Sequence, residues 1–317
     1  MKDSLQRLSF AFAIAALTIF PWLGNSYQIS FLTSILVWAL YALSFDLLFG
    51  YTGLLSLGHS VYFGLGAYGA ALAIKQLHLS LWLALLVGMG IALLAALAIG
   101  LFVVRVKSHG FIIITAVTSL VFYLLAQSGR ELTHGNDGFS FTTPPIVFGL
   151  VDWSFSNPIV RFYFALIIVT LAFLALWWLV RTPLGQAFRL IRENEVRAEI
   201  IGYPVTQLKF MAFVIAGTFA GFAGAVYALT NRFVSTELFH WTISADAIIW
   251  TLFGGAGTLI GPVVGTGLLF WVKEWLSEVW KTGYPLLVGL VILLLIRFAP
   301  DGLVGLARRL IGRRNST

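Results

Sequence analysis

Long apolar stretches alternate with short polar ones along the whole chain. A helix needs about 20 mostly apolar residues to cross the hydrocarbon core of a bilayer. Ten stretches approach that length: 8–24, 29–49, 54–75, 80–104, 110–128, 159–180, 210–230, 244–257, 262–281 and 284–299. The eighth is short, and glycines interrupt the third. The pattern therefore predicts an all-α polytopic membrane protein with about ten transmembrane helices and glycine-broken segments.

Residues 181–209 form the one long charged run between two apolar blocks, with five basic and three acidic side chains. A segment this polar cannot cross a bilayer, so it lies in water. Gly202 and Pro204 end a helical pattern in this run, which predicts a short amphipathic helix at the membrane surface. A solvated connector is the alternative that the pattern leaves open. The apolar residues at helical spacing are Leu184, Ala187, Phe188, Ile191, Val196 and Ile200.

Basic residues are divided unevenly between the two sides that alternating spans define. Ten spans place both termini on one side, together with the 181–209 loop, and that side carries fourteen Lys and Arg residues against six on the other. Basic loops stay in the cytoplasm. The asymmetry predicts cytoplasmic N and C termini, a cytoplasmic loop at 181–209 and an external loop at 129–158.

Two glycine-rich stretches break the helical pattern, residues 50–69 and 254–267, one in each half of the chain. Broken helices at membrane depth are tolerated only where they are buried or line a cavity, and in transporters they mark the solute pathway. Glycines four residues apart also allow close helix packing, which we expect to be the role of most of them. Because only the first stretch adds polar side chains, a substrate pathway is expected at Gly53, Ser56, Gly58, His59, Ser60, Gly66 and Tyr68.

Composition and missing motifs exclude several classes of protein. Only 10% of residues are charged, whereas soluble domains carry about 25%. The net charge of +7 lies mostly beside apolar spans, where it sets topology, so nucleic acid is not an expected partner. There is no cysteine, no HExxH, no P-loop and no GxSxG motif. We therefore expect neither a metal site nor a cofactor, and any ATP must bind another chain.

Ionisable residues inside the spans are few, and none lies convincingly at a span centre. Asp46 lies near one end of its span and Asp246 near the start of another. Amides at a helix end, or water, can satisfy such carboxylates. A structural role is therefore the expectation for both, with a proton relay as the alternative.

Five stretches of the chain resemble a known family, in the same order and over most of its length. They are GYTGLLSLGHSVYFGLGAYGAALA (50–73), LTHGNDGF (132–139), LGQAFRLIRENEVRAEIIGYPVTQLKFMAFVIAGTFAGFAGAVYA (184–228), FGGAGTLIGPVVGTGLL (253–269) and APDGLVGLARR (299–309). The chain resembles the LivM-type permease subunits of branched-chain amino acid ABC importers. Ser60 stands where that family more often has alanine.

The resemblance implies a single permease domain over residues 1–317, without enzymatic activity, in the inner membrane of a cell. It implies three kinds of partner besides the lipid bilayer: a LivH-type second permease, two cytoplasmic ATPase subunits and a periplasmic substrate-binding protein. It also implies that the 181–209 loop couples to the ATPases, through Phe188, Ile191, Arg192, Glu193, Glu195, Glu199 and Gly202.

Three transport hypotheses follow. The first is an ATP-driven importer of branched-chain or related amino acids. The second is an ion-coupled secondary transporter that uses Asp46 or Asp246. The third is an ABC permease for urea or short amides. A membrane-embedded enzyme is disfavoured because no nucleophile, base or metal constellation is present.

Overall fold

The computed structural model describes residues 17–106, 108–148 and 151–281, with isolated positions up to residue 306. Five of its helices are long and apolar enough to cross a membrane: α2 (Ser26–Thr52), α4 (Leu81–Val103), α5 (Ser108–Ser128), α7 (Pro158–Leu179) and α10 (Val205–Asn231). Three further helices pack among them: α3 (His59–Lys75), α11 (Trp241–Gly254) and α12 (Ile260–Val279). The predicted class, a helical multi-pass membrane protein, is confirmed. Most of predicted spans 8–24 and 284–299 lies outside the described residues.

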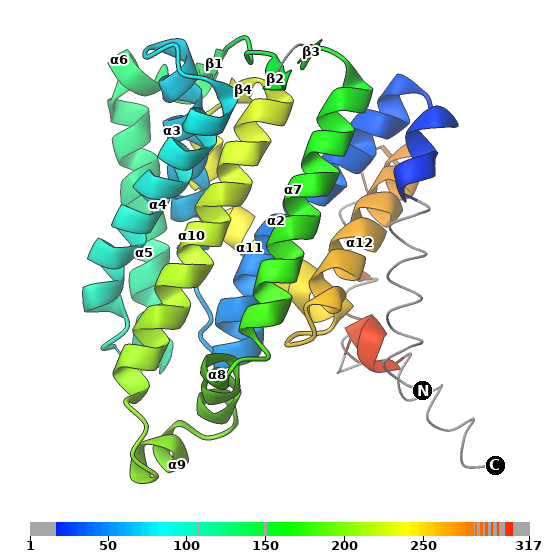
Figure 1. Ribbon diagram of the computed structural model, residues 1–317. Coiled ribbons are helices and arrows are strands. Elements are labelled where there is room, and N and C mark those ends of the chain that lie inside the picture. Colours follow the sequence, from blue (N-terminus) through cyan, green and yellow to red (C-terminus); the bar gives the residue numbers. More distant parts are fainter. Residues whose placement is uncertain are drawn as a thin grey trace, which may run out of the picture.

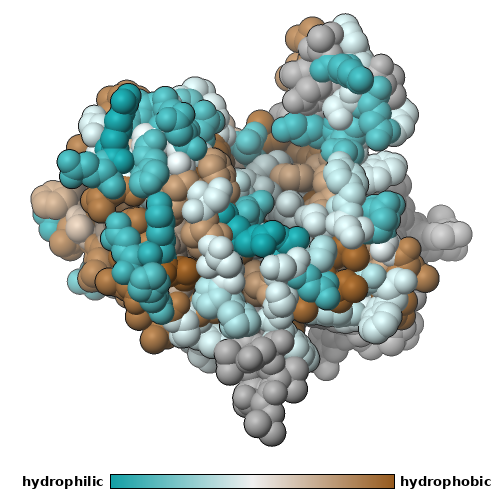
Figure 2. Space-filling model, turned by 90° about the horizontal axis from the view of Figure 1, so that it is seen from above, coloured by the Kyte–Doolittle hydropathy of each residue, from teal (hydrophilic) through white to brown (hydrophobic). Residues whose placement is uncertain are grey.

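The connections gather at the two ends of the bundle (Figure 1). One end, called the strand end below, carries α6 (Arg130–Thr133), η2 (Gly135–Asp137) and four short strands. Strand β1 (Phe139–Ser140) pairs antiparallel with β4 (Phe233–Val234), and β2 (Ile146–Phe148) with β3 (Val151–Trp153). The opposite end carries α8 (Pro183–Glu193) and α9 (Glu195–Ile200). Figure 2 views the strand end and shows hydrophilic residues across it, with hydrophobic residues along the sides.

Helix α3 packs against α4, α5, α10 and α11, and Phe63 of α3 also contacts Trp38 and Tyr41 of α2. Its small residues allow this close approach. A Cβ atom at Gly66 would overlap the carbonyl group of Gly221 on α10, and one at Gly88 of α4 would lie 2.5 Å from the Gly66 carbonyl oxygen. Such small-residue contacts replace the hydrophobic effect as a packing force between helices in lipid. The core of the protein is thus a three-helix contact of α3, α4 and α10.

Two of the helices packed inside the bundle, α3 and α11, are too short to cross a membrane alone. At 1.5 Å per residue α3 extends about 26 Å and α11 about 21 Å, whereas the hydrocarbon core is about 30 Å thick. The predicted third span, 54–75, is helical only from His59, because residues 53–58 before α3 are irregular. Residues 235–240 before α11 form only the 3-10 turn η3 (Thr236–Phe239). The described part of the chain thus contains two half-helices, each preceded by an irregular connection.

Candidate functional site

The two irregular connections start at opposite ends of the bundle and meet inside it. Gly53 lies beside Arg192 of α8, while the other connection follows β4 at the strand end. They meet at the first residues of α3, where the Ser60 amide donates a hydrogen bond to Ser244 Oγ at 2.8 Å. The Ser60 hydroxyl also donates to the Phe239 carbonyl oxygen at 3.1 Å. The N-termini of α3 and α11 are therefore joined directly.

Hydroxyl groups satisfy the non-helical backbone at this meeting point. Leu57 N donates to Thr115 Oγ1 at 3.1 Å, and Gly58 N donates to Ser56 Oγ at 3.3 Å. Ser119 of α5 donates to the Phe239 carbonyl oxygen at 2.6 Å. Irregular backbone survives at membrane depth only with such internal partners. We call the group of buried side chains Ser44, His59, Ser60, Ser119 and Ser244 the hydroxyl cluster.

His59 is the one ring in this cluster, and it is fully buried. Its Nε2 atom lies 2.9 Å from Ser44 Oγ. Its Nδ1 atom has no hydrogen-bond partner among the described residues. Phe45 and Tyr41 pack against the ring, at centroid distances of 5.4 and 5.3 Å. His59 is thus held in an aromatic setting with one free ring nitrogen.

The structure brings only part of the predicted pathway set together. Ser56, Gly58, His59 and Ser60 lie at the hydroxyl cluster, and all are buried inside this one chain. Tyr68 lies farther along α3, stacked 5.5 Å from Phe239. The remaining two, Gly53 and Gly66, lie elsewhere. Gly66 packs against α10, and Gly53 ends α2 with a left-handed φ of 77°, beside α8.

Sequence reasoning missed the partners Ser44, Ser119 and Ser244. Each is a lone serine in an apolar helix, and serine hydroxyls in such helices usually bond to their own backbone. Only their spatial convergence on α3 distinguishes them.

The two glycine-broken stretches also meet, near the α8–α9 end. Asp46 of α2 is fully buried and accepts hydrogen bonds from Gly257 N at 2.6 Å and Leu259 N at 3.1 Å. A Cβ atom at Gly50 would overlap the Gly257 amide, so only glycine fits there. Asp46 thus caps the turn between α11 and α12, which agrees with the structural role expected for it. We call Asp46, Gly50, Gly257 and Leu259 the glycine junction.

Arg192 joins the charged loop to the glycine junction. Its Nη1 atom donates to the Gly50 carbonyl oxygen, which lies in the last turn of α2. The same atom lies against Gly257. A cation at the C-terminus of a helix interacts favourably with the free carbonyl groups there. One side chain of α8 therefore touches α2 and the α11–α12 turn together.

The predicted amphipathic helix is present, but it is broken into two. Asn194 interrupts it with extended backbone, and its side chain caps α9 by accepting from Arg197 N at 2.9 Å. Phe188 and Ile191 of α8 are buried within this chain, at 0% and 3% exposure. The expectation that these two present an apolar ridge to a partner is therefore corrected, because they seat α8 on the chain's own helices.

The break at Asn194 turns the second half of the apolar stripe outward. Val196, Ile200 and Ile201 are 64%, 80% and 62% exposed. We call this set, with Tyr203, the α9 ridge. Glu195 is not free for a partner, because it forms a 2.5 Å ion pair with the buried Lys209. Gly202 ends the segment with a φ of 98°, while Glu193 and Glu199 are exposed. Lys209 itself belongs to α10, which starts at Val205.

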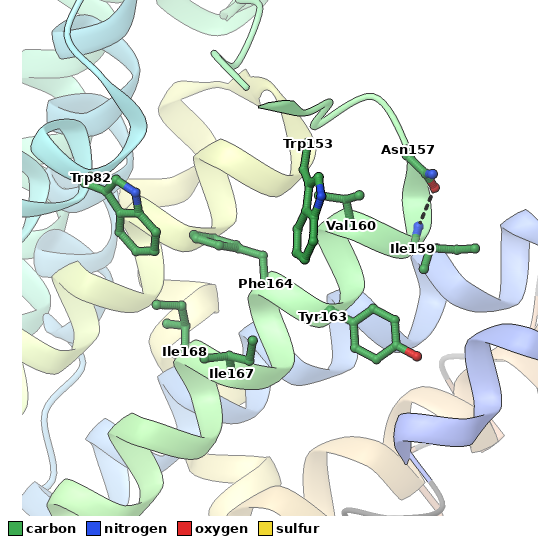
Figure 3. A pocket seen from close by; sticks show the side chains of 9 residues that line it. All are labelled: Trp82, Trp153, Asn157, Ile159, Val160, Tyr163, Phe164, Ile167 and Ile168. Atoms are coloured by element: carbon green, nitrogen blue, oxygen red, sulfur yellow. Dashed lines mark hydrogen bonds between the residues drawn. The ribbon is translucent and has the colours of Figure 1, made fainter. Parts of the chain in front are cut away.

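A cavity of about 460 Å³ opens between α4 and α7 near the strand end (Figure 3). Its walls are aromatic and aliphatic, and Trp82, Trp153 and Phe164 point into it. The hydrogen bond drawn there is local to α7, from Ile159 N to Asn157 Oδ1 at 2.9 Å. This cavity offers little that could hold a charged solute.

The helical bundle, its half-helices and its glycine junction define a multi-pass membrane permease. The chain belongs to the family described as "Branched-chain amino acid transport system / permease component", which matches residues 27–299. It is similar to the LivM permease proteins of Salmonella typhimurium and Escherichia coli, with 27% and 28% identity over 96% and 99% of this chain and 77% and 78% of theirs. The LivH permease of Salmonella typhimurium is 25% identical, over 84% of this chain and 91% of its own. No solved structure matches the chain.

Proposed function

We propose that the chain is the LivM-type permease subunit of an ATP-driven importer for branched-chain or related amino acids. In this proposal it lies in the inner membrane with a LivH-type second permease, two cytoplasmic ATPases and a periplasmic binding protein. Both termini and the 181–209 loop face the cytoplasm, and the strand end faces the binding protein. The relatives' names support the substrate class and the pairing of two permeases.

The observation that carries the proposal is the exposed α9 ridge, connected inward through Arg192. Apolar side chains that project into water from a charged surface are typical of a docking site for another protein. In our account the ATPases bind the α9 ridge, and α8 moves with it. Arg192 passes that motion to the glycine junction, and α2 and α11 pass it to the hydroxyl cluster. Phe188, Ile191 and Gly202 keep α8 and α9 at the required angle.

An ion-coupled carrier is the alternative that this geometry favours less. Asp46 accepts two amide hydrogen bonds and holds a turn in place. A carboxylate committed in this way is poorly placed to exchange an ion during each transport cycle. Guanosine is a further solute to consider, because a guanosine permease protein of Bacillus subtilis is 31% identical over 28% of this chain.

The docking role predicts a specific effect of charge on the α9 ridge. Ile200→Glu places a carboxylate where an apolar anchor is expected and should weaken ATPase binding about 30-fold or more, since such anchors contribute about 2 kcal/mol or more. Gln207→Glu is the matched control, because Gln207 is exposed on the same side. Affinity is measured between the detergent-purified permease pair and its ATPase. Equal affinity for both variants would contradict the assignment.

The orientation predicts that single cysteines placed on the two sides of the membrane are labelled from opposite sides. The chain contains no cysteine, so single cysteines give no background from this subunit. Glu199→Cys and Arg313→Cys should react with an impermeant maleimide only when the cytoplasmic side is accessible. Asp137→Cys should react only from outside. Labelling of Asp137→Cys from the cytoplasmic side alone would overturn the topology.

A further inference from the structure

A second cavity at the strand end is small and polar, unlike the one between α4 and α7. Its volume is about 130 Å³, and it lies between the ends of α2, α7 and α10. Four hydroxyl groups, one amide and one guanidinium group line it: Ser30, Thr33, Ser34, Thr230, Asn231 and Arg161. We call it the outer pocket.

Arg161 gives the outer pocket a positive charge that no described acidic residue balances. Its Nη1 atom makes a long hydrogen bond of 3.4 Å to the Thr230 carbonyl oxygen. The described residues contain one salt bridge, and Arg161 is not part of it. Arg232 lies close enough to add a second positive charge. Arg161 is also in the first turn of α7, where a cation is disfavoured by the helix dipole. A half-buried guanidinium group with free N–H groups is the usual partner of a carboxylate.

The hydroxyl groups of the pocket are committed as donors, which leaves them as acceptors. Thr33, Ser34 and Thr230 donate to carbonyl oxygens one turn earlier in their helices, at 2.8, 3.1 and 2.9 Å. A hydroxyl oxygen has two lone pairs. Those of Thr33 and Ser34 remain for a third party, whereas Thr230 Oγ1 keeps one, because it accepts a 3.4 Å hydrogen bond from Asn231 Nδ2. Asn231 likewise uses its NH₂ group on the Tyr227 carbonyl oxygen, at 3.1 Å. The remaining acceptor oxygens of the pocket therefore suit a donor without acceptors, such as an ammonium group.

An aromatic cluster separates the outer pocket from the hydroxyl cluster along α2. Trp38 lies one turn beyond Ser34 and stacks on Phe63 at 4.9 Å, with Tyr227 at 5.4 Å and Trp250 at 5.5 Å. Ser44 follows less than two turns later and contacts His59. We call the four rings the aromatic plug. Along α2 the outer pocket comes first, then the aromatic plug, and then the hydroxyl cluster.

We propose that the outer pocket binds the carboxylate and ammonium groups of a free α-amino acid before it passes the aromatic plug. Arg161 holds the carboxylate, and the hydroxyl oxygens with Asn231 Oδ1 hold the ammonium group. The side chain points toward the open mouth, so the pocket selects amino acids over urea or a nucleoside without choosing strongly among side chains. This inference rests on the proposed import of amino acids.

Thiol protection in the assembled transporter tests it without relying on transport. Ser34→Cys is a near-isosteric change in a chain without native cysteine, and methyl methanethiosulfonate is small and neutral enough to reach it. L-leucine at twice its dissociation constant should slow the modification about threefold, since one third of the sites remain free. 4-Methylpentanoate lacks the ammonium group and 3-methylbutylamine lacks the carboxylate, so neither should protect at the same concentration. Adding Arg161→Gln should abolish protection, and adding Arg130→Gln, an exposed cation at the same end, should preserve it.

Two results would overturn the inference while leaving the proposed function intact. One is ATP-dependent leucine uptake by a complex in which up to 100 mM leucine gives no protection, a concentration on the order of ten times a weak millimolar dissociation constant. The other is protection by the binding protein alone, with or without leucine, which would make the pocket part of a protein contact. Absence of any amino acid uptake by the wild-type complex would instead refute the proposed function.

Discussion

Replacing Gly66 with valine is expected to leave no assembled, extractable protein. Gly66 faces the backbone of Gly221, and a side chain there would have to push α3 away from α10 along their whole contact. Inserting even a few carbon atoms into a tight core costs about 1–3 kcal/mol, and more where the neighbour is backbone that cannot move. The loss should therefore show first in membrane insertion and thermal stability, before any transport is measured.

Gly90→Val is the matched control for Gly66→Val. Gly90 lies in α4, and an added Cβ atom would meet nothing within 4 Å. In a helix interior valine is slightly better than glycine, so this variant should insert and melt like the native protein. Comparable yields and melting temperatures for the two variants would show that the α3–α10 contact is looser than described.

The Gly66 result also decides whether the glycine at this position lines a solute pathway or allows close helix packing. The sequence groups Gly58 and Gly66 as pathway residues because both lie in the one glycine-rich stretch, 50–69, that adds polar side chains. The structure separates them, because Gly58 lies against the Thr115 carbonyl oxygen, 2.5 Å from an added Cβ, at the hydroxyl cluster. Gly58→Leu is therefore the substitution that probes the connection, whereas Gly66→Val probes packing.

Replacing Arg192 with alanine is expected to uncouple ATP hydrolysis from uptake. Arg192 is the residue of α8 that contacts both Gly50 and Gly257. A hydrogen bond to a charged group contributes about 1.5–3 kcal/mol, so its loss should lower uptake per ATP about 10- to 100-fold. The measurement is binding-protein-stimulated ATP hydrolysis alongside uptake in reconstituted complexes.

Arg189→Ala is the control for Arg192→Ala on the same helix. The Arg189 guanidinium group lies 5.0 Å from the centre of the Tyr51 ring, whereas the hydrogen bond to Gly50 comes from Arg192. An exposed cation–π contact contributes about 0.5–1 kcal/mol, so coupling should fall no more than about fivefold. Equal losses of coupling in the two variants, in complexes that retain their ATPases, would contradict the prediction. Coupling would then depend on α8 in general and not on the contact of Arg192 with the glycine junction.

Local periodicity predicted most of the membrane helices because lipid imposes a length and a polarity on each span separately. The stretches 80–104 and 159–180 correspond closely to α4 and α7. The hydroxyl cluster could not be predicted in this way, because Ser60 meets Ser119 and Ser244 across 59 and 184 residues of chain. No single-residue signal marks such pairs in an apolar background.

In the charged loop, residues 181–209, local periodicity also failed to predict part of the structure. The helical pattern of the loop gave α8 and the apolar stripe with Phe188 and Ile191, but it did not show that this stripe packs on the chain's own helices. The pattern continued smoothly through Asn194, because asparagine is compatible with a helix surface and with a helix cap. Only the cap geometry shows that the chain turns there, and this turn decides that Val196 and Ile200 point into water. The exposed α9 ridge therefore differs from the ridge that periodicity suggests.

The most direct test of the account is L-leucine accumulation in proteoliposomes assembled from defined parts. We predict accumulation only when this chain, the second permease, both ATPases, leucine-loaded binding protein and ATP on the ATPase side are all present. We predict none for this chain alone under a proton or sodium gradient. Accumulation by the chain alone, driven by such a gradient and abolished by Asp46→Asn, would contradict an ATP-driven importer and identify an ion-coupled carrier.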